Sequence, residues 1–156
     1  MLSLVLASCG GAAGPGAAYP QDVPFQDHES VSQADLGQST PAIAVAVDAG
    51  TKAELDRIAG SARPVPEGRL AIAVFQGDQR TGGYTVRVER VTLRTAATLE
   101  VHAVFTSPAA DAVVTQVLTS PAHIVTVARA DVSGVDRVVL LDQAGEQRAS
   151  VTVPIR

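Results

Sequence analysis

The sequence is poor in aromatic residues and in cysteine. Its 156 residues contain no tryptophan, and phenylalanine and tyrosine together make up 3% of the chain. A single cysteine, Cys9, excludes an internal disulfide. Hydrophobic residues nevertheless reach 46%, and valine and alanine supply most of them. This composition favours a β-rich core built from small side chains.

An excess of basic residues is also missing. Twelve Lys and Arg residues stand against sixteen Asp and Glu residues, which gives a net charge of −4 with the two signs mixed along the chain. Binding to nucleic acid requires a basic face that neutralises phosphates. We therefore expect no nucleic-acid partner.

The motifs of common enzymes are absent as well. The chain has no His-Glu-x-x-His or Cys-x-x-Cys spacing, no Gly-x-Ser-x-Gly elbow and no phosphate-binding loop. His102 lies beside Glu100 in a strand pattern and is expected to be a surface histidine. His123 stands at the entry of a strand, where a backbone hydrogen bond is a simpler role than acid–base chemistry. We expect a protein without catalytic residues, metal or cofactor, although an enzyme with a site hidden from sequence stays open.

The N-terminus resembles a bacterial lipoprotein signal. A short apolar run is followed by Leu6-Ala7-Ser8-Cys9, the pattern of a lipobox. Residues 1–9 would then be the signal peptide, with Cys9 lipidated as the new N-terminus. Because no basic residue precedes the apolar run, we expect the natural start to lie further upstream. Gly10, rather than Asp, implies sorting to the outer membrane in a cell with two membranes, whereas the alternative is an incidental cysteine.

Residues 10–40 are rich in Gly, Ala, Pro, Ser and Gln and show no sustained periodicity, which is typical of a flexible tether. The triplet Asp27-His28-Glu29 is too isolated to indicate a metal site. The folded domain is expected over residues 41–156.

Within that domain the pattern predicts about eight strands and one short helix. The helix is expected from Thr51, through a capping box with Glu54, to a stop at Gly60. The strands are expected at residues 42–47, 70–75, 84–93, 99–105, 113–118, 124–128, 138–141 and 149–155. We therefore predict a mainly antiparallel β domain, either a sandwich or an open barrel.

The domain is organised around residues 70–88, which read as strand, loop and strand. The first run is apolar at every position, as expected for a central strand buried on both faces. The second alternates with Val86 and Val88 on one face, but Val91 and Leu93 fall out of phase. A one-residue slip of this kind predicts a β-bulge near Glu89.

Two blocks in this region resemble the protease complex subunit PrcB family. The first is Gly77 followed by Thr81-Gly82-Gly83-Tyr84-Thr85-Val86, and the second runs from Val114 to Val125. The resemblance implies an envelope protein, often a lipoprotein, that associates with an exported protease and stabilises it. It implies no catalytic residue.

Two interpretations of the Thr-Gly-Gly-Tyr segment remain open. The glycines could serve a tight bend, with Tyr84 as a core anchor. Alternatively, the segment forms an exposed loop that contacts a partner, and its binding residues would then be Asp78, Arg80, Thr81, Gly82, Gly83 and Tyr84. A second function is also open, because chagasin-like protease inhibitors are exported β domains that insert a Thr-Gly-Tyr loop into the protease cleft. Here the Thr81–Tyr84 loop would take that role.

Overall fold

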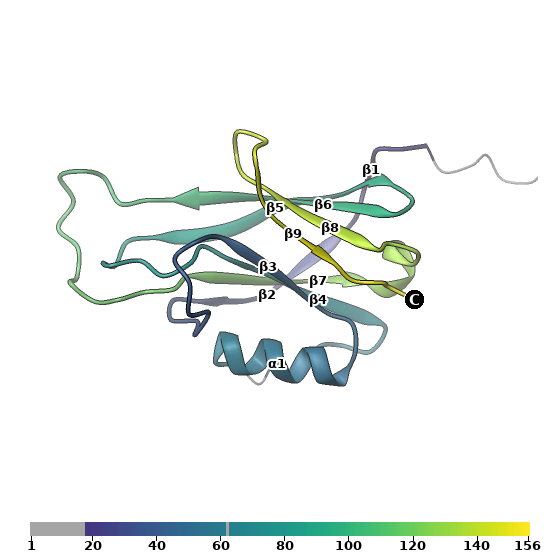
Figure 1. Ribbon diagram of the computed structural model, residues 1–156, viewed down its shortest axis with the longest axis horizontal. Helices are drawn as coiled ribbons and strands as arrows, with labels where there is room; N and C mark the ends of the chain where they lie inside the picture. The colour runs from purple at the N-terminus through teal and green to yellow at the C-terminus, as the bar shows by residue number, and fades with distance from the viewer. Residues whose placement is uncertain (1–17, 62) are drawn as a thin grey trace, which may run out of the picture.

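The computed structural model describes residues 18–61 and 63–156, which form two sheets packed face to face (Figure 1). The five-stranded sheet has the order β1 (Gln21–Asp22), β5 (Thr85–Thr95), β6 (Thr98–Thr106), β8 (Arg137–Leu141) and β9 (Gln147–Thr152). The four-stranded sheet has the order β2 (Phe25–Val31), β7 (Ala122–Ala128), β4 (Arg69–Phe75) and β3 (Ala42–Ala46). The predicted mainly β fold is confirmed, and the two separate sheets make it a sandwich rather than a barrel.

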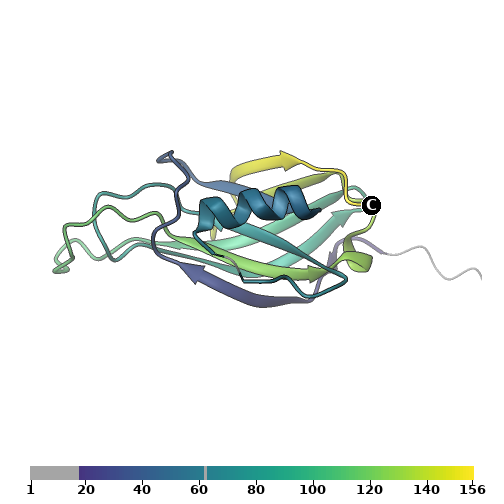
Figure 2. The same ribbon diagram turned by 90° about the horizontal axis from the view of Figure 1, so that it is seen from below.

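The strand β4 is buried on both of its faces, as its continuous apolar run predicts. Ile72 and Val74 point into the core between the two sheets. Ala71, Ala73 and Phe75 point the other way, where they pack beneath the helix α1 (Ala49–Ala59). Figure 2 shows α1 lying across the outer face of the four-stranded sheet.

The helix begins earlier than predicted, because its N-terminal cap is Asp48, three residues before the predicted cap Thr51. The Asp48 carboxylate accepts from the Thr51 backbone N–H at 2.8 Å, and the Thr51 hydroxyl oxygen accepts from the Asp48 N–H at 3.0 Å. This is a capping box shifted by one turn from the predicted one. The C-terminal stop at Gly60 is confirmed, with φ +65°.

The β-bulge predicted near Glu89 is present in β5. The pairing with β6 shifts register between Val88 and Arg90. The shift keeps Val88 and Val91 both in the core, each 1% exposed. In a regular strand, two residues three positions apart would point to opposite faces. The out-of-phase valines in the sequence were therefore a correct signal.

The predicted boundary between tether and domain at residue 41 is wrong. β1 and β2 lie within residues 10–40 and pair with β5 and β7. Both are strands at the margins of their sheets, and the largely polar β2 sequence, Phe25–Val31, lacks the apolar alternation on which strand prediction depends. The predicted signal, residues 1–9 with Cys9, lies outside the described residues, as do residues 10–17.

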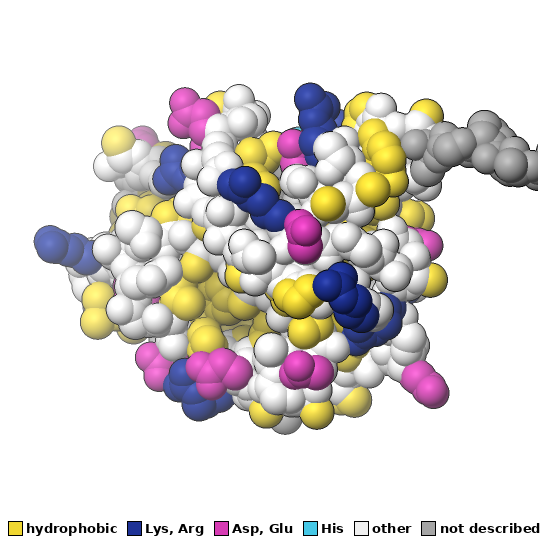
Figure 3. Space-filling model, turned by 45° about the vertical axis from the view of Figure 1, so that its right-hand side comes forward, with side chains coloured by type: hydrophobic (Ala, Val, Ile, Leu, Met, Phe, Trp, Pro, Cys, Tyr) yellow, Lys and Arg dark blue, Asp and Glu magenta, His cyan; other side chains and the backbone are white. Residues whose placement is uncertain are grey.

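One pairing departs from the antiparallel pattern. β6 and β8 run parallel, with Leu99 opposite Val138, and the 3₁₀ helix η1 (Arg129–Val132) lies on the connection that makes this possible. The other paired strands are antiparallel. Over residues 18–61 and 63–156, no helix combines the length and hydropathy needed to span a bilayer. Basic and acidic side chains are interspersed on the face drawn in Figure 3.

Candidate functional site

Two long connections project from one end of the sandwich and form a surface that we call the loop end. It consists of residues 76–84, which join β4 to β5, and residues 107–121, which join β6 to β7. Both extend beyond the ends of the strands in the two views (Figures 1 and 2). Most connections in compact domains are shorter than residues 107–121, and long loops of this kind are commonly functional.

The two connections are hydrogen-bonded to each other. Gln79 and Thr119 exchange backbone bonds of 2.7 and 3.0 Å. The Gly82 N–H donates to the Thr115 carbonyl at 2.9 Å, and the Thr119 hydroxyl donates to the Thr81 carbonyl at 2.8 Å. The shorter connection therefore supports the longer one, and the two form a single surface.

The glycines of the Thr-Gly-Gly-Tyr segment are required by this packing. Gly83 has φ +87°, and a Cβ there would lie 3.0 Å from the Pro108 side chain. Gly82 is buried, and its Cβ would lie 2.4 Å from the Thr115 hydroxyl oxygen. The bend predicted at these glycines is thus present, and its cause is the close approach of the second connection.

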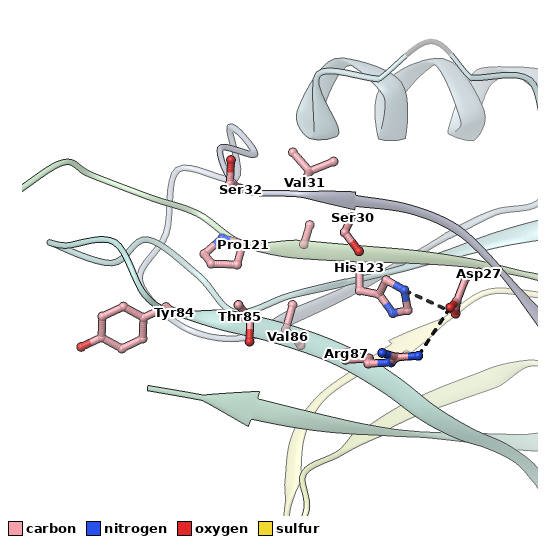
Figure 4. A pocket seen from close by; sticks show the side chains of 11 residues that line it. Asp27, Ser30, Val31, Ser32, Tyr84, Thr85, Val86, Arg87, Pro121 and His123 are labelled. Carbon is pink, nitrogen blue, oxygen red and sulfur yellow. Dashed lines mark ion pairs between the residues drawn. The ribbon is translucent and has the colours of Figure 1, made fainter. Parts of the chain in front are cut away.

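The remaining candidate contact residues differ in their exposure. Asp78 and Arg80 are exposed, whereas Thr81 and Tyr84 are half-buried. The Tyr84 ring points away from the sandwich interior (Figure 4). The segment therefore presents side chains to solvent at some positions only, and its contact with a partner stays a prediction.

The longer connection exposes apolar side chains that sequence reasoning assigned to a strand. The strand predicted at residues 113–118 is absent, and Val113, Val117 and Leu118 are 103%, 42% and 73% exposed. The region between two prolines, Pro108 and Pro121, was the signal against a strand. Three large exposed apolar side chains on one connection make it a candidate interaction site.

A groove between β2 and β5 is the second candidate site, and Figure 4 shows it from close by. Its volume is about 390 Å³. His123 of β7 lies on its floor, and its Nε2 lies 3.5 Å from an Asp27 carboxylate oxygen of β2. The other Asp27 oxygen lies 3.7 Å from the Arg87 guanidinium of β5. Residues from both sheets therefore meet here.

His123 fastens the bulged strand through its other ring nitrogen. Nδ1 accepts the Val88 N–H at 2.9 Å, which assigns the ring proton to Nε2 on the side of Asp27. Burial lowers the pKa of His123, while Asp27 raises it and Arg87 lowers it further. The predicted backbone hydrogen bond is confirmed, although it reaches a strand rather than a loop.

The other titratable residues singled out from the sequence do not converge. His102 is half-buried, with Nε2 3.6 Å from a Glu100 oxygen and Nδ1 3.5 Å from the Arg90 guanidinium. Burial and then Arg90 lower the pKa of His102, against Glu100. His28 and Glu29 point away from the groove, toward Arg63 and Ser61. Within the part of the chain that the structure describes, no three His, Cys, Asp or Glu residues are grouped as metal ligands.

One family model matches the part of the chain that forms the loop end. Residues 70–128 match the family model described as PrcB C-terminal. The match begins in β4 and ends at the last residue of β7, so it contains both connections in full. No curated protein and no solved structure matches the chain.

Proposed function

We propose, from the match of residues 70–128 to the PrcB C-terminal family model, that the protein is a non-catalytic accessory subunit that binds an exported protease through its loop end. The single observation that carries the proposal is the exposure of Val113, Val117 and Leu118 on a connection held in place by hydrogen bonds. Removing such side chains from water is the usual driving force of association.

The exposed apolar side chains of this connection would contribute substantially to the affinity of a contact. Full burial of a valine or leucine side chain is worth about 1.5–3 kcal/mol. Two such side chains would therefore account for at least a hundredfold in affinity, or about 3 kcal/mol. Because the connection is already fixed by the bonds from Gln79 and Gly82, little conformational freedom is lost when a partner binds.

We further propose that the protein is an envelope lipoprotein anchored through Cys9, at the outer membrane in a cell with two membranes. The lipobox pattern Leu6-Ala7-Ser8-Cys9 supports this. Several acyl chains on one cysteine would give stable anchoring, because each buried methylene contributes about 0.8 kcal/mol.

The test is co-purification of tagged full-length protein from crosslinked envelopes, read by mass spectrometry. We expect a secreted protease in near-equal amount, and at least about tenfold less of it with Val113→Ser/Leu118→Ser. Tyr19→Ser is the matched control, because Tyr19 is 43% exposed but lies beside β1, at the far end of the sandwich. Equal recovery with both variants would refute the loop end as the contact, and the absence of any protease would refute the function.

The alternative of a chagasin-like inhibitor is less favoured by the geometry. Gly82 is buried beneath Thr115, so the Thr81–Tyr84 loop cannot enter a cleft unless residues 107–121 move aside. Activity assays separate the two. An accessory subunit prolongs the activity of its protease at 37 °C, whereas an inhibitor abolishes the activity of papain-like or subtilisin-like proteases at stoichiometric amounts.

A further inference from the structure

The edge of β5 that faces away from β6 is open over part of its length. The direction of its backbone groups follows from the neighbouring strand. Phe105 of β6 stands opposite Val86, and both its N–H and its carbonyl bond to the Gln143 side chain, at 3.1 and 3.3 Å. Val86 and Phe105 are therefore a non-hydrogen-bonded pair. It follows that the Val86 N–H and carbonyl face the open edge.

Further along this edge, several outward-facing backbone groups are bonded within the chain. β1 pairs with Leu93, and the Val23 N–H donates to the Val91 carbonyl at 2.8 Å. The Val88 N–H is taken by His123. Beyond that point the chain has crossed to the other sheet through Pro24, and within the described residues no strand pairs with this edge at Val86.

The groove lies at the open part of the edge. Val86, Pro121, Ala122 and Tyr84 give it apolar lining, and Ser30, Ser32 and Thr85 give it neutral polar lining. The two charged residues at its rim, Asp27 and Arg87, face each other at 3.7 Å and compensate one another. The groove thus offers main-chain hydrogen bonds and space for small uncharged side chains, but no charge of one sign.

We propose that this groove binds a short extended peptide segment of a partner protein, with small uncharged side chains, which continues the ladder of β1 by pairing with Val86. Strand addition of this kind obtains its affinity from main-chain hydrogen bonds and its selectivity from the pockets for alternate side chains. The groove shares Tyr84 and Pro121 with the loop end, but its lining does not include the exposed Val113, Val117 and Leu118. The inference therefore goes beyond the proposed function and holds whatever the partner of the loop end is.

The probe is a phage-displayed library of uncharged heptapeptides rich in Val, Thr, Ser and Ala, selected on the full chain. Val86→Pro removes the outward N–H without removing a donor from the β5–β6 ladder, because Val86 does not donate to β6. Val86→Ala is the matched control, since it also shortens the side chain but retains the N–H. We expect selected peptides to bind the alanine variant within about threefold of the wild type and the proline variant about tenfold or more weakly.

A second measurement uses only the wild-type protein, so it tests the proposal even if the proline variant does not fold. Amide hydrogen exchange of the wild-type protein should slow at Val86 when a selected peptide binds, because a solvent-facing N–H becomes a donor to the peptide. Exchange at Arg87, whose N–H belongs to the ladder with β6, serves as the internal reference.

Three results would overturn the proposal. The first is a library that yields no peptide above selection on an unrelated β-sandwich. The second is equal binding of peptides to the proline variant together with unchanged exchange at Val86. The third is a concentration-dependent dimer in sedimentation that Val86→Pro abolishes, which would assign the edge to a second copy of the chain instead.

Discussion

Among single residues, Gly83 shows how the loop end depends on its shorter connection. Its φ of +87° strains any other residue, and a β-branched side chain would also meet Pro108 and Val114. We predict that Gly83→Val lowers the free energy of unfolding by about 2–4 kcal/mol, measured by urea denaturation. Gly145→Val is the matched control, because Gly145 has φ +79° with no atom within 4 Å of its added Cβ. A Gly83 variant no less stable than the Gly145 variant would contradict the packing role.

His123 is expected to make the stability of the protein depend on pH. Burial lowers its pKa in the folded protein below the ordinary value of 6.5, so the unfolded chain binds more protons in the window below 6.5. Stability is therefore fully present above about pH 6.5 and falls as the pH decreases through the folded pKa. Protonation also removes the Nδ1 acceptor of the Val88 N–H.

The prediction is tested with His123→Asn, whose side-chain oxygen can replace Nδ1 as the acceptor but does not titrate. Thermal melts between pH 7.5 and 5 should show a smaller loss of stability for this variant than for the wild type. Because the pKa of His102 is also lowered, His102→Asn is run in parallel and should retain most of the acid sensitivity. Identical pH profiles for the wild type and His123→Asn would be evidence against His123 as the group that titrates.

At the scale of elements, the sequence predicts best where apolar residues follow a clear pattern, whether continuous or alternating. The continuous apolar run of β4 and the out-of-phase valines of β5 led directly to a central strand and a bulge. β2 was missed because it is an edge strand with a largely polar sequence, which lacks the alternation of apolar residues that predicts a strand. The parallel pairing of β6 with β8 could not be read from the sequence, since strand order depends on long-range contacts.

The bend at the Thr-Gly-Gly-Tyr segment was predicted from the sequence, but the connection that packs against it was not. The Thr-Gly-Gly-Tyr segment lies at the loop end as a support, while the exposed tip belongs to residues 107–121. Val113–Leu118 has the composition of a strand, but β propensity measures fit to a pleated, half-buried surface, and the tip has no neighbouring strand to pair with. The groove escaped prediction because its lining comes from β2, β5 and β7, which are distant in sequence.

The helix α1 packs on the outer face of the four-stranded sheet, and its contribution to stability can be tested with single substitutions. Leu55 is 3% exposed and packs in the cluster beneath α1, together with Phe75 and Ala59. We predict that Leu55→Ala costs about 2–4 kcal/mol in urea denaturation. Ile58→Ala, at a half-buried position of the same helix, should cost less. Equal costs would contradict the packing of α1 through Leu55.

At the scale of the whole molecule, β1 and the loop end lie at opposite ends of the sandwich, and this bears on the proposed function. The C-terminus lies at the same end as β1 (Figure 1). A chain anchored through its N-terminal segment would therefore hold the loop end on the side away from the membrane. This arrangement suits a subunit that presents its contact surface to an exported partner.

The anchor itself is tested with Cys9→Ala in cells that express the protein from its full natural start. We predict that this variant moves from the membrane to the soluble fraction and no longer incorporates labelled palmitate, because Cys9 is the residue that the lipobox pattern marks for acylation. Val113→Ser/Leu118→Ser should remain in the membrane fraction, since its changes lie at the other end of the molecule. If Cys9→Ala stays with the membrane, the lipoprotein assignment is wrong and the loop end must reach its partner from another attachment. If the variant is released but still co-purifies with a protease after crosslinking, the anchor and the contact are independent of each other.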